Sequence, residues 1–386
     1  MSKIVLSIHN IHTWGKPMLT RSGDINILED IANNARERNL EGSDTINEVV
    51  YAAISEDNLK QLRHLYPTLK FTHFKYFETH GDEVFIMPMI DTRGQEDQFT
   101  QELRRFYGFI SIYEHVVMNI CRQDDYYTKL IESTQDDNLK LEVSKLLSEP
   151  KAYMTHHPTN DVEPFEELEQ VSHSDNQLLS FSFKDNLKMN DHAQHKSIVF
   201  NRPSSMKGFP LWLDFVLNEK HYKRNYGEAL YVGNISGLSK IDEIKAIFEK
   251  KYQKPFDEIV EIHDSIESFN QSKVSDKPQI INSGYQQHEI KELAKDYTTF
   301  IVSSDYNHIS GDYVMIEYAM LEALQYGLRL RWSQTSIRSM VDNYKFEAAK
   351  MALRLNALDY DEQVEHFKEA YSPDLFTDRV IEAARK

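Results

Sequence analysis

The stretch DYVMIEYAMLEALQYGLRLRW, residues 312–332, joins a helical apolar pattern to two carboxylates. Its apolar residues recur near helical spacing after Gly311 and Asp312, a pair that can begin and cap a helix. We therefore predict a buried helix that begins at this glycine. Glu317 and Glu322 would point to adjoining sides of its first turns. Such carboxylates either face solvent on an amphipathic helix or, if buried, require a partner or a ligand.

A second stretch, residues 198–217, has the pattern of a strand, a basic loop and a helix. The apolar run IVF leads into NRPSSMKGF and then into PLWLDFVL. The loop carries two cations, Arg202 and Lys207, two hydroxyls, Ser204 and Ser205, and the backbone N–H groups of a helix start. Such groups suit a diphosphate. The alternative is an ordinary polar loop.

Three motifs together resemble those of the bacteriophage DNA α-glucosyltransferase family. Members of this family are retaining sugar-nucleotide transferases of GT-B fold. The motifs are Ser-His-Ser-Asp-Asn at 172–176, Arg-x4-Lys-Gly-Phe at 202–209 after a strand, and Ile-Glu-Tyr-x2-Leu-Glu-x4-Gly at 316–327. They occur in the expected order. With weaker similarity at 85–120 and 280–305, the resemblance extends over most of the chain but includes few identical residues.

The resemblance implies roles for residues of the donor site. Arg202 and Lys207 would hold the donor diphosphate, Glu322 would bind the ribose, and Glu317 would lie beside the transferred sugar. Sugar-nucleotide transferases of this fold bind the base just after a strand and glycine turn, which makes Tyr285 a candidate for packing near uracil. A core tyrosine is the alternative reading of Tyr285.

Candidate residues of the N-terminal half follow apolar strand-like runs. The run Lys3–Ser7 opens on a loop with Gly15, which could let the backbone approach the donor, or could serve a plain turn. The run FISIY, residues 109–113, is predicted as a strand and is followed by Glu114 and His115. Because ligands bind past the carboxyl ends of parallel strands, we assign these two residues to the acceptor side. A capped strand end explains them equally.

His156 and His157 stand before Pro158, after a strand-like run at 152–154. Their place before a proline predicts a loop at a strand end. The resemblance gives them a catalytic position facing the acceptor, where the family pattern is His-Asp-His. This chain has Thr155 in place of the first histidine and lacks the acid, so its acid–base chemistry departs from the family. No third ligand follows at metal-binding spacing, and we predict no metal site.

The length of 386 residues exceeds a single core and predicts two domains. Strand-like and helical runs alternate, which favours doubly wound parallel sheets. We predict an α/β chain of GT-B fold, with two Rossmann-like domains and the site in the interdomain cleft. Residues 1–190 would form the acceptor-side domain and 191–364 the UDP-sugar-binding domain, with 184–197 as linker. By resemblance, a C-terminal helix at about 365–386 packs back on the first domain.

Composition narrows the class of protein. The single cysteine, Cys121, excludes an internal disulfide and a thiolate zinc cluster. No run of 18 apolar residues occurs, and the apolar segment at the N-terminus is too short for a signal peptide. We therefore expect a soluble cytoplasmic protein without a membrane partner, located in the host cytoplasm if a phage encodes it.

The net charge of −17 argues against indiscriminate binding to polyanions. A DNA substrate would then require a focused basic face. Candidates for such a face are Arg104 with Arg105, the segment 220–224, and Arg329 with Arg331.

The leading hypothesis from the resemblance is transfer of glucose, or a pentose such as arabinose, from a UDP-sugar to 5-hydroxymethylcytosine in double-stranded phage DNA. This modification would protect the DNA from host nucleases. A glycan, lipid or small-molecule acceptor is the alternative, and it suits the negative charge better. A third reading is a non-catalytic protein with a degenerate transferase fold. The UDP-sugar is expected as co-substrate without a tightly bound cofactor, and metal dependence and oligomeric state stay open.

Overall fold

The computed structural model describes part of the first half of the chain and most of the second half. Up to residue 180 the described residues are 3–7, 23–40, 49–53, 56–73, 83–87, 115–120, 137–138, 141 and 152–155. Beyond it they are 181–378 without 192–195, 202–206, 219–227, 239, 273–274, 309–311 and 313. The chain divides into two compact units, Met1–Ser182 with Ala370–Lys386, and Phe183–Glu369. The predicted boundary after residue 190 therefore lies inside the second unit.

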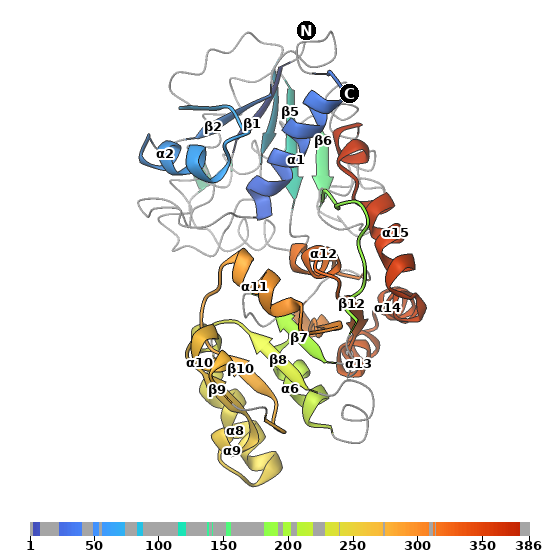
Figure 1. The fold of residues 1–386 in the computed structure, drawn as a ribbon. Coiled ribbons are helices and arrows are strands. Elements are labelled where there is room, and N and C mark those ends of the chain that lie inside the picture. The colour runs from blue at the N-terminus through green and yellow to red at the C-terminus, as the bar shows by residue number, and fades with distance from the viewer. Residues whose placement is uncertain are drawn as a thin grey trace. The chain divides into compact units, whose positions relative to one another are not determined.

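The first unit holds a parallel six-stranded sheet with the order β3-β2-β1-β4-β5-β6. Its strands are β1 (Lys3–Ser7), β2 (Val49–Ala53), β3 (Phe71–His73), β4 (Glu83–Met87), β5 (His115–Ile120) and β6 (Ala152–Thr155). Helices α1 (Gly23–Glu37) and α2 (Glu56–Leu65) follow β1 and β2 in the chain (Figure 1). This is the Rossmann-like strand order, and it confirms the predicted fold class for this unit.

The strand predicted at 109–113 lies outside the described residues. The structure has a strand just beyond it, at His115–Ile120. His115 therefore opens β5 at the amino end, opposite Val84 of β4, and does not follow a carboxyl end. Periodicity alone cannot identify a short apolar run such as HVVMNI as a strand, because its pairing with β4 and β6 decides. The strand-end argument for the acceptor side therefore does not apply to His115, and Glu114 lies outside the described residues.

The last described residues of the chain attach to α1. Residues 373–378 are helical. Asn34 Nδ2 donates a 2.8 Å hydrogen bond to Asp374 Oδ1. The guanidinium of Arg38 forms an ion pair with Asp378 at 2.7 Å. These contacts join the C-terminal segment to the first unit.

The second unit holds another parallel six-stranded sheet, with the order β12-β11-β7-β8-β10-β9. Its strands are β7 (Ser197–Phe200), β8 (Ala229–Val232), β9 (Glu261–His263), β10 (Gln279–Ile281), β11 (Thr299–Val302) and β12 (Arg329–Trp332). The α-helices are α6 (Phe209–Leu217), α8 (Ile241–Tyr252), α9 (Phe256–Ile259), α10 (Ile266–Asn270), α11 (Gln287–Ala294), α12 (Tyr318–Gln325), α13 (Gln334–Asp342), α14 (Phe346–Ala357) and α15 (Tyr360–Ala370). The described residues of the unit also include two 3-10 turns, η4 (Ile235–Gly237) and η5 (Tyr306–His308).

The strand order of the second sheet defines a switch point between β7 and β11. From β7 the chain builds β8, β9 and β10 on one side, and then returns to add β11 and β12 on the other. Strands β7, β8 and β11 are buried along their whole length, as expected for apolar strands inside a parallel sheet. In sheets of this kind, ligands bind outside the carboxyl ends of the strands at the switch point.

The stretch 312–332 does not form the single predicted helix. Residues 314–317 are not helical, α12 begins only at Tyr318, and the end of the stretch is the edge strand β12. Gly327 has a φ of 83° and ends the helix, as glycine often does past a helix C-terminus. The alternation of buried and half-buried residues in β12 then follows the period of a strand.

Asp312 does cap a helix, although not the predicted one. Its carboxylate accepts hydrogen bonds from the N–H groups of Glu347 and Ala348, at 3.1 and 2.8 Å. These N–H groups belong to the first turn of α14, where such donors lack partners within the helix. The segment before α12 is therefore anchored to α14.

The predicted linker packs against the second unit at Asn190. Its side-chain amide donates to the carbonyl groups of Ala294, Tyr297 and Tyr326, at 2.9 to 3.0 Å. A Cβ on Gly327 would lie 2.5 Å from Asn190 Oδ1, so glycine is required for this close approach.

No helix in the described parts of the chain is long and apolar enough to cross a membrane.

Candidate functional site

The segments that follow β7 and β11 touch each other at Gly208. This glycine has a φ of 62° and is the N-cap of α6. A Cβ at this position would lie 1.7 Å from the carbonyl oxygen of Ser303, which directly follows β11. Only glycine fits both the left-handed backbone and this approach. The Lys-Gly-Phe motif therefore joins the two strands that border the switch point.

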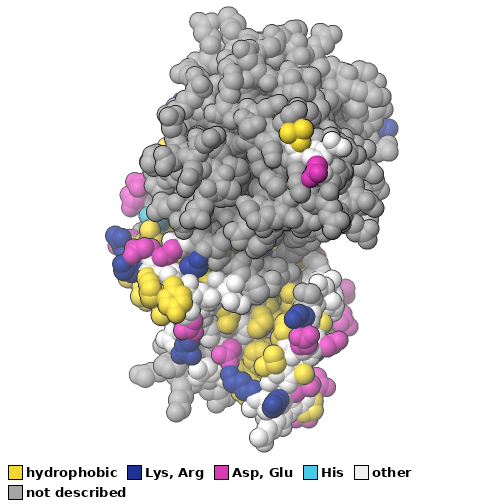
Figure 2. Space-filling model, turned by 180° about the vertical axis from the view of Figure 1, so that it is seen from behind, with side chains coloured by type: hydrophobic (Ala, Val, Ile, Leu, Met, Phe, Trp, Pro, Cys, Tyr) yellow, Lys and Arg dark blue, Asp and Glu magenta, His cyan; other side chains and the backbone are white. Residues whose placement is uncertain are grey.

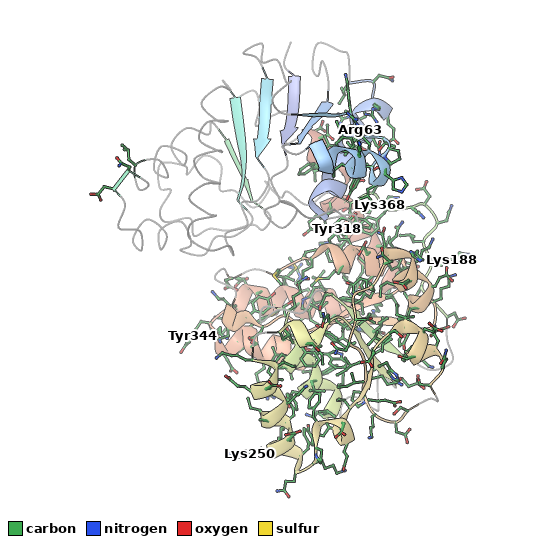
Figure 3. The ribbon with its side chains drawn as sticks, turned by 90° about the vertical axis from the view of Figure 1, so that its left-hand side faces the viewer. Arg63, Lys188, Lys250, Tyr318, Tyr344 and Lys368 are labelled. Atoms are coloured by element: carbon green, nitrogen blue, oxygen red, sulfur yellow. The ribbon has the colours of Figure 1, made fainter. Side chains whose placement is uncertain are left out.

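Lys207 and Glu317 form an ion pair at this junction. Lys207 Nζ lies 2.5 Å from Glu317 Oε2, and the two side chains are 25% and 13% exposed. Glu317 is the N-cap of α12 with an extended backbone, and its side chain makes no capping hydrogen bond. Tyr318, labelled in Figure 3, is the first residue of that helix. The carboxylate is therefore directed to the lysine rather than to its own helix.

The backbone before Glu317 is held in place by buried groups. The N–H of Met315 donates a 3.0 Å hydrogen bond to Tyr306 Oη, and the Tyr306 side chain is fully buried. Val314, Met315 and Ile316 are themselves buried. Together with the Asp312 cap on α14, these contacts fix the position of Glu317 without help from a regular element.

Glu322 lies within α12 and accepts a hydrogen bond from a second helix. Gln287 Nε2, at the start of α11, donates to Glu322 Oε1 at 2.6 Å. Burial raises the pKa of the Glu322 carboxyl from 4.5 to about 7, and the hydrogen bond from Gln287 partly opposes this increase. A carboxyl group with such a pKa changes charge near neutral pH.

Three tyrosines face the two carboxylates. Burial is the main cause that raises the pKa of the Tyr285 hydroxyl, and the charges of Glu322 and Glu317 raise it further. The pKa of the Tyr231 hydroxyl is also raised by burial, with contributions from Tyr285 and Glu317. Burial and the charge of Glu322 likewise raise the pKa of Tyr326. Phenols and carboxylates therefore share one electrostatic environment.

Phe200, the last residue of β7, supports these tyrosines. Its ring meets Tyr285 edge-on, with 6.4 Å between the ring centroids, and lies 6.2 Å from the ring of Tyr326. The hydroxyl of Tyr231 donates a 2.8 Å hydrogen bond to Asn201 Oδ1, just past the same strand. The aromatic groups thus form a fixed wall beside the carboxylates.

The arrangement suits a ligand that carries both hydroxyls and phosphates. An ammonium group attracts phosphate oxygens, and α6 begins beside Lys207 with no acidic residue in its first turn. The carboxylates accept hydrogen bonds from hydroxyl groups. Among the described residues, no group of three or more His, Cys, Asp or Glu side chains could hold a metal ion.

Asp359, in the only Asp-x-Asp pair of the sequence, caps a helix. Its carboxylate accepts a hydrogen bond from the N–H of Glu362, and the Glu362 side chain accepts one from the N–H of Asp359. This reciprocal pair is a capping box at the start of α15.

Arg329 and Arg331, which the sequence suggested for a basic face, both donate hydrogen bonds to backbone carbonyls. Arg331 donates to the carbonyl oxygen of Asn356, and Arg329 donates to those of Asn356 and Leu358. These carbonyls lie at the C-terminal end of α14, where the last C=O groups lack helical partners. Both arginines are therefore engaged in closing a helix end.

Several predicted site residues lie outside the described parts of the chain. They are Arg202, Gly15, Glu114, His156 and His157, and of His115 only the backbone is described. The strand β6 ends at Thr155, so the two histidines directly follow its carboxyl end. Of the predicted residues that the structure describes with side chains, Lys207 pairs with Glu317, and Tyr285 faces Glu317 and Glu322.

Sequence reasoning missed Gln287 and Tyr326. Tyr326 lies inside the Glu-x4-Gly motif, directly before Gly327, and Gln287 is the first residue of the helix after the Tyr285 turn. Both positions are visible in the sequence. Their contact with Glu322 depends on how α11 and α12 pack, and no local pattern reports that.

No protein-family model and no curated protein matches the chain. Among solved structures, an alpha-glucosyltransferase in complex with UDP-glucose and DNA containing an abasic site is similar, with a TM-score of 0.54 and 12% identity over 100% of both chains. Another alpha-glucosyltransferase complex, with UDP and DNA containing a HMU base, gives 0.53 and 13% identity over 100% of this chain and 99% of the other. The resemblance inferred from the motifs is thereby confirmed for the fold, and the chain is a GT-B structure like that of alpha-glucosyltransferase.

Proposed function

We propose that this chain is a retaining glycosyltransferase that moves glucose, or a pentose such as arabinose, from a UDP-sugar to 5-hydroxymethylcytosine in DNA. The observation that carries the proposal is the pairing of Lys207 with Glu317 at the switch point of the second sheet, with Glu322 and Tyr285 beside it. The alpha-glucosyltransferases of the same fold were solved with UDP or UDP-glucose and with DNA, which supports this choice of donor and acceptor.

The second unit would bind the donor. Lys207, with Arg202 from the same loop, would hold the diphosphate through charge-assisted contacts. Glu322 would accept hydrogen bonds from the ribose, and Glu317 would orient the sugar hydroxyls. Tyr285 would pack near uracil, since it follows β10 in the turn before α11.

The first unit would hold the acceptor. His156 and His157 follow the carboxyl end of β6, and Gly15 follows that of β1, which neighbours β4 at the switch point of the first sheet. A histidine can bind the acceptor or exchange a proton with it near neutral pH. The backbone at Gly15 would approach the donor.

Transfer with retention would proceed on one face of the sugar. The bond from the anomeric carbon to the β-phosphate oxygen breaks, and a bond from that carbon to the hydroxymethyl oxygen forms on the same face. The hydroxyl proton passes to the departing phosphate oxygen, and UDP leaves. The contribution of Lys207 is to stabilise the charge that develops on the diphosphate.

The negative charge of the chain bears directly on the acceptor. On the face of the molecule drawn in Figure 2, basic and acidic side chains are interspersed among the described residues. With Arg329 and Arg331 engaged at α14, the remaining candidates for a DNA-binding face are Arg104 with Arg105 and residues 220–224. DNA binding through so few cations would be weak and steeply dependent on salt. An acceptor glycan, lipid or small molecule is the second candidate, favoured by the net charge of −17.

The proposal is tested with a panel of UDP-sugars, each supplied with hydroxymethylated DNA, unmodified DNA or a free glycan. We expect UDP release from one donor to depend on hydroxymethylated DNA. Release that depends on the glycan alone would select the second candidate. Failure to cleave any donor with any acceptor would contradict transferase activity.

A further inference from the structure

Gln287 and Glu322 join two helices beside the proposed donor site. They are 35 residues apart in the chain, and their side chains meet at 2.6 Å. Gln287 is the first residue of α11 and Glu322 lies in the second turn of α12. The contact therefore depends on tertiary packing and is not a local feature of either helix.

The start of α11 is fixed by two further contacts. The N–H of Gln286 donates a 2.6 Å hydrogen bond to Glu289 Oε2, which forms one half of a capping box. Earlier in the same turn, the Asn282 side chain accepts from the N–H of Ser236 and donates to its hydroxyl. Gln287 is thus presented to Glu322 from a well-anchored turn.

The hydrogen bond occupies one oxygen of the Glu322 carboxylate. Among the described residues, Gln287 supplies the hydrogen bond to Oε1, which leaves Oε2 to accept from a ligand. An amide N–H stabilises the ionised carboxylate and fixes its plane. Without this hydrogen bond, the Glu322 carboxyl group could rotate and would be protonated more readily.

Among the described residues, the ionisable groups around Glu322 give little other support to its negative charge. Tyr285 faces it from the turn before α11, and Tyr326 faces it from the end of α12. On β12, against which α12 packs, Arg329 and Arg331 are bonded to carbonyls of α14. Because the pKa of Glu322 is about 7, its carboxyl group would be protonated in about half of the molecules at neutral pH. The hydrogen bond from Gln287 is the contribution that favours the ionised form.

We infer that Gln287 is a positioning residue that orients the Glu322 carboxylate and favours its ionised form for the ribose hydroxyls of the donor. This inference rests on the proposed function, because it takes Glu322 to be the ribose-binding group. Gln287 itself acts through Glu322 and need not touch the donor.

The test measures UDP affinity by calorimetry from pH 5.5 to 9 for the wild-type protein and for Gln287→Ala. His288→Ala, which changes the exposed neighbour on the same helix, is the matched control. We expect Gln287→Ala to bind UDP about tenfold more weakly at pH 7. The pH at which affinity reaches half its high-pH value should also move upward, while His288→Ala retains the wild-type profile.

An isosteric variant separates positioning from packing. Gln287→Glu keeps the size of the side chain but places a second carboxyl group against Glu322. Like charges raise the pKa of such a pair, so the midpoint should move further upward than in Gln287→Ala. If the role were only to fill space, Gln287→Glu would bind UDP like the wild type, and the inference would be wrong.

A ligand lacking the ribose hydroxyls completes the test. With 2′,3′-dideoxy-UDP, the wild-type protein and Gln287→Ala should bind with equal affinity. A tenfold difference that persists for this ligand would overturn the assignment to ribose. If the wild-type protein does not bind UDP at all, the proposed function fails. If it does, and Gln287→Ala has an unchanged pH profile, only this inference fails.

Discussion

Lys207 and Glu317 pair across the switch point of the second sheet, with Nζ 2.5 Å from Oε2. One residue follows β7 and the other precedes α12, so the ion pair joins the two halves of the sheet's carboxyl edge. In the proposed donor site, the same ammonium group would serve the diphosphate while its partner serves the sugar. The pair would therefore place the leaving group and the transferred sugar side by side.

Replacing Lys207 by alanine should weaken UDP binding and leave the fold intact. A charge-assisted contact with phosphate contributes about 1.5 to 3 kcal/mol, which corresponds to about 10- to 150-fold in the dissociation constant. Calorimetry with UDP measures this loss.

Lys196→Ala is the matched control for this prediction. Lys196 pairs with Glu228 at 2.8 Å, and the two side chains are 28% and 25% exposed, close to the exposure of Lys207. It lies at the amino end of β7, the opposite edge of the sheet. Equal UDP affinities of the two variants would remove Lys207 from the diphosphate site.

Glu322→Gln and Glu317→Gln should separate nucleotide binding from turnover. If Glu322 binds ribose, its variant should lose affinity for bare UDP as well as for the UDP-sugar. If Glu317 faces the sugar, its variant should retain UDP affinity and lose turnover. The reverse pattern in calorimetry and steady-state rates would exchange the two assignments.

Glu322 should make the stability of the protein depend on pH. Its folded-state pKa of about 7 exceeds the ordinary value of 4.5, so the folded state holds the proton more tightly than the unfolded state. Stability should therefore fall as pH rises from 4.5 to 7, by up to about 3 kcal/mol. Glu322→Gln removes this decline and should be the more stable protein at pH 8 but not at pH 4.5.

Urea unfolding at pH 4.5 and pH 8 measures this difference. A stability gain of the same size at both pH values would mean that ionisation of Glu322 is not the cause. A more stable variant that binds UDP poorly would also indicate that this carboxylate is retained for function rather than for folding.

Gly208→Ala should destabilise the second unit by more than about 1 kcal/mol, since it requires both a left-handed backbone and a shift of the Ser303 carbonyl. UDP affinity should fall with it, because Lys207 is the preceding residue. Gly237→Ala is the control: nothing lies within 4 Å of its added Cβ. Thermal unfolding of both variants provides the measurement, and a Gly208→Ala protein of wild-type stability would refute the contact with Ser303.

Strands could be predicted from the sequence where a short apolar run is bounded by polar residues. The strand at Lys3–Ser7 has the bounds of its apolar run, and β7, predicted from the run IVF at 198–200, begins one residue earlier at Ser197. The prediction of a single helix for residues 312–332 was wrong because the apolar residues of this stretch belong in turn to an extended segment, a helix and an edge strand. The hydrogen bond of Met315 to Tyr306, the close approach of Asn190 to Gly327 and the pairing of β12 with β11 separate these elements. None of these contacts shows in a local sequence pattern.

The site could be predicted in part for a similar reason. The motifs contain Lys207, Glu317 and Glu322, and the structure brings the lysine to the first of these carboxylates. Gln287 has no motif, and its value as a partner of Glu322 arises only when α11 meets α12. That Asp312 caps α14 could not be predicted either, because α12 lies nearer to it in the sequence.

Transfer of a sugar from a UDP-sugar to hydroxymethylated DNA can be measured directly by mass analysis of nucleosides after incubation with UDP-glucose, UDP-arabinose and hydroxymethylcytosine DNA. We expect a hydroxymethyldeoxycytidine nucleoside heavier by one sugar residue with the wild-type protein and with Lys196→Ala, and greatly reduced product with Lys207→Ala. Unmodified nucleosides in every reaction, in the presence of measurable UDP binding, would contradict the DNA acceptor.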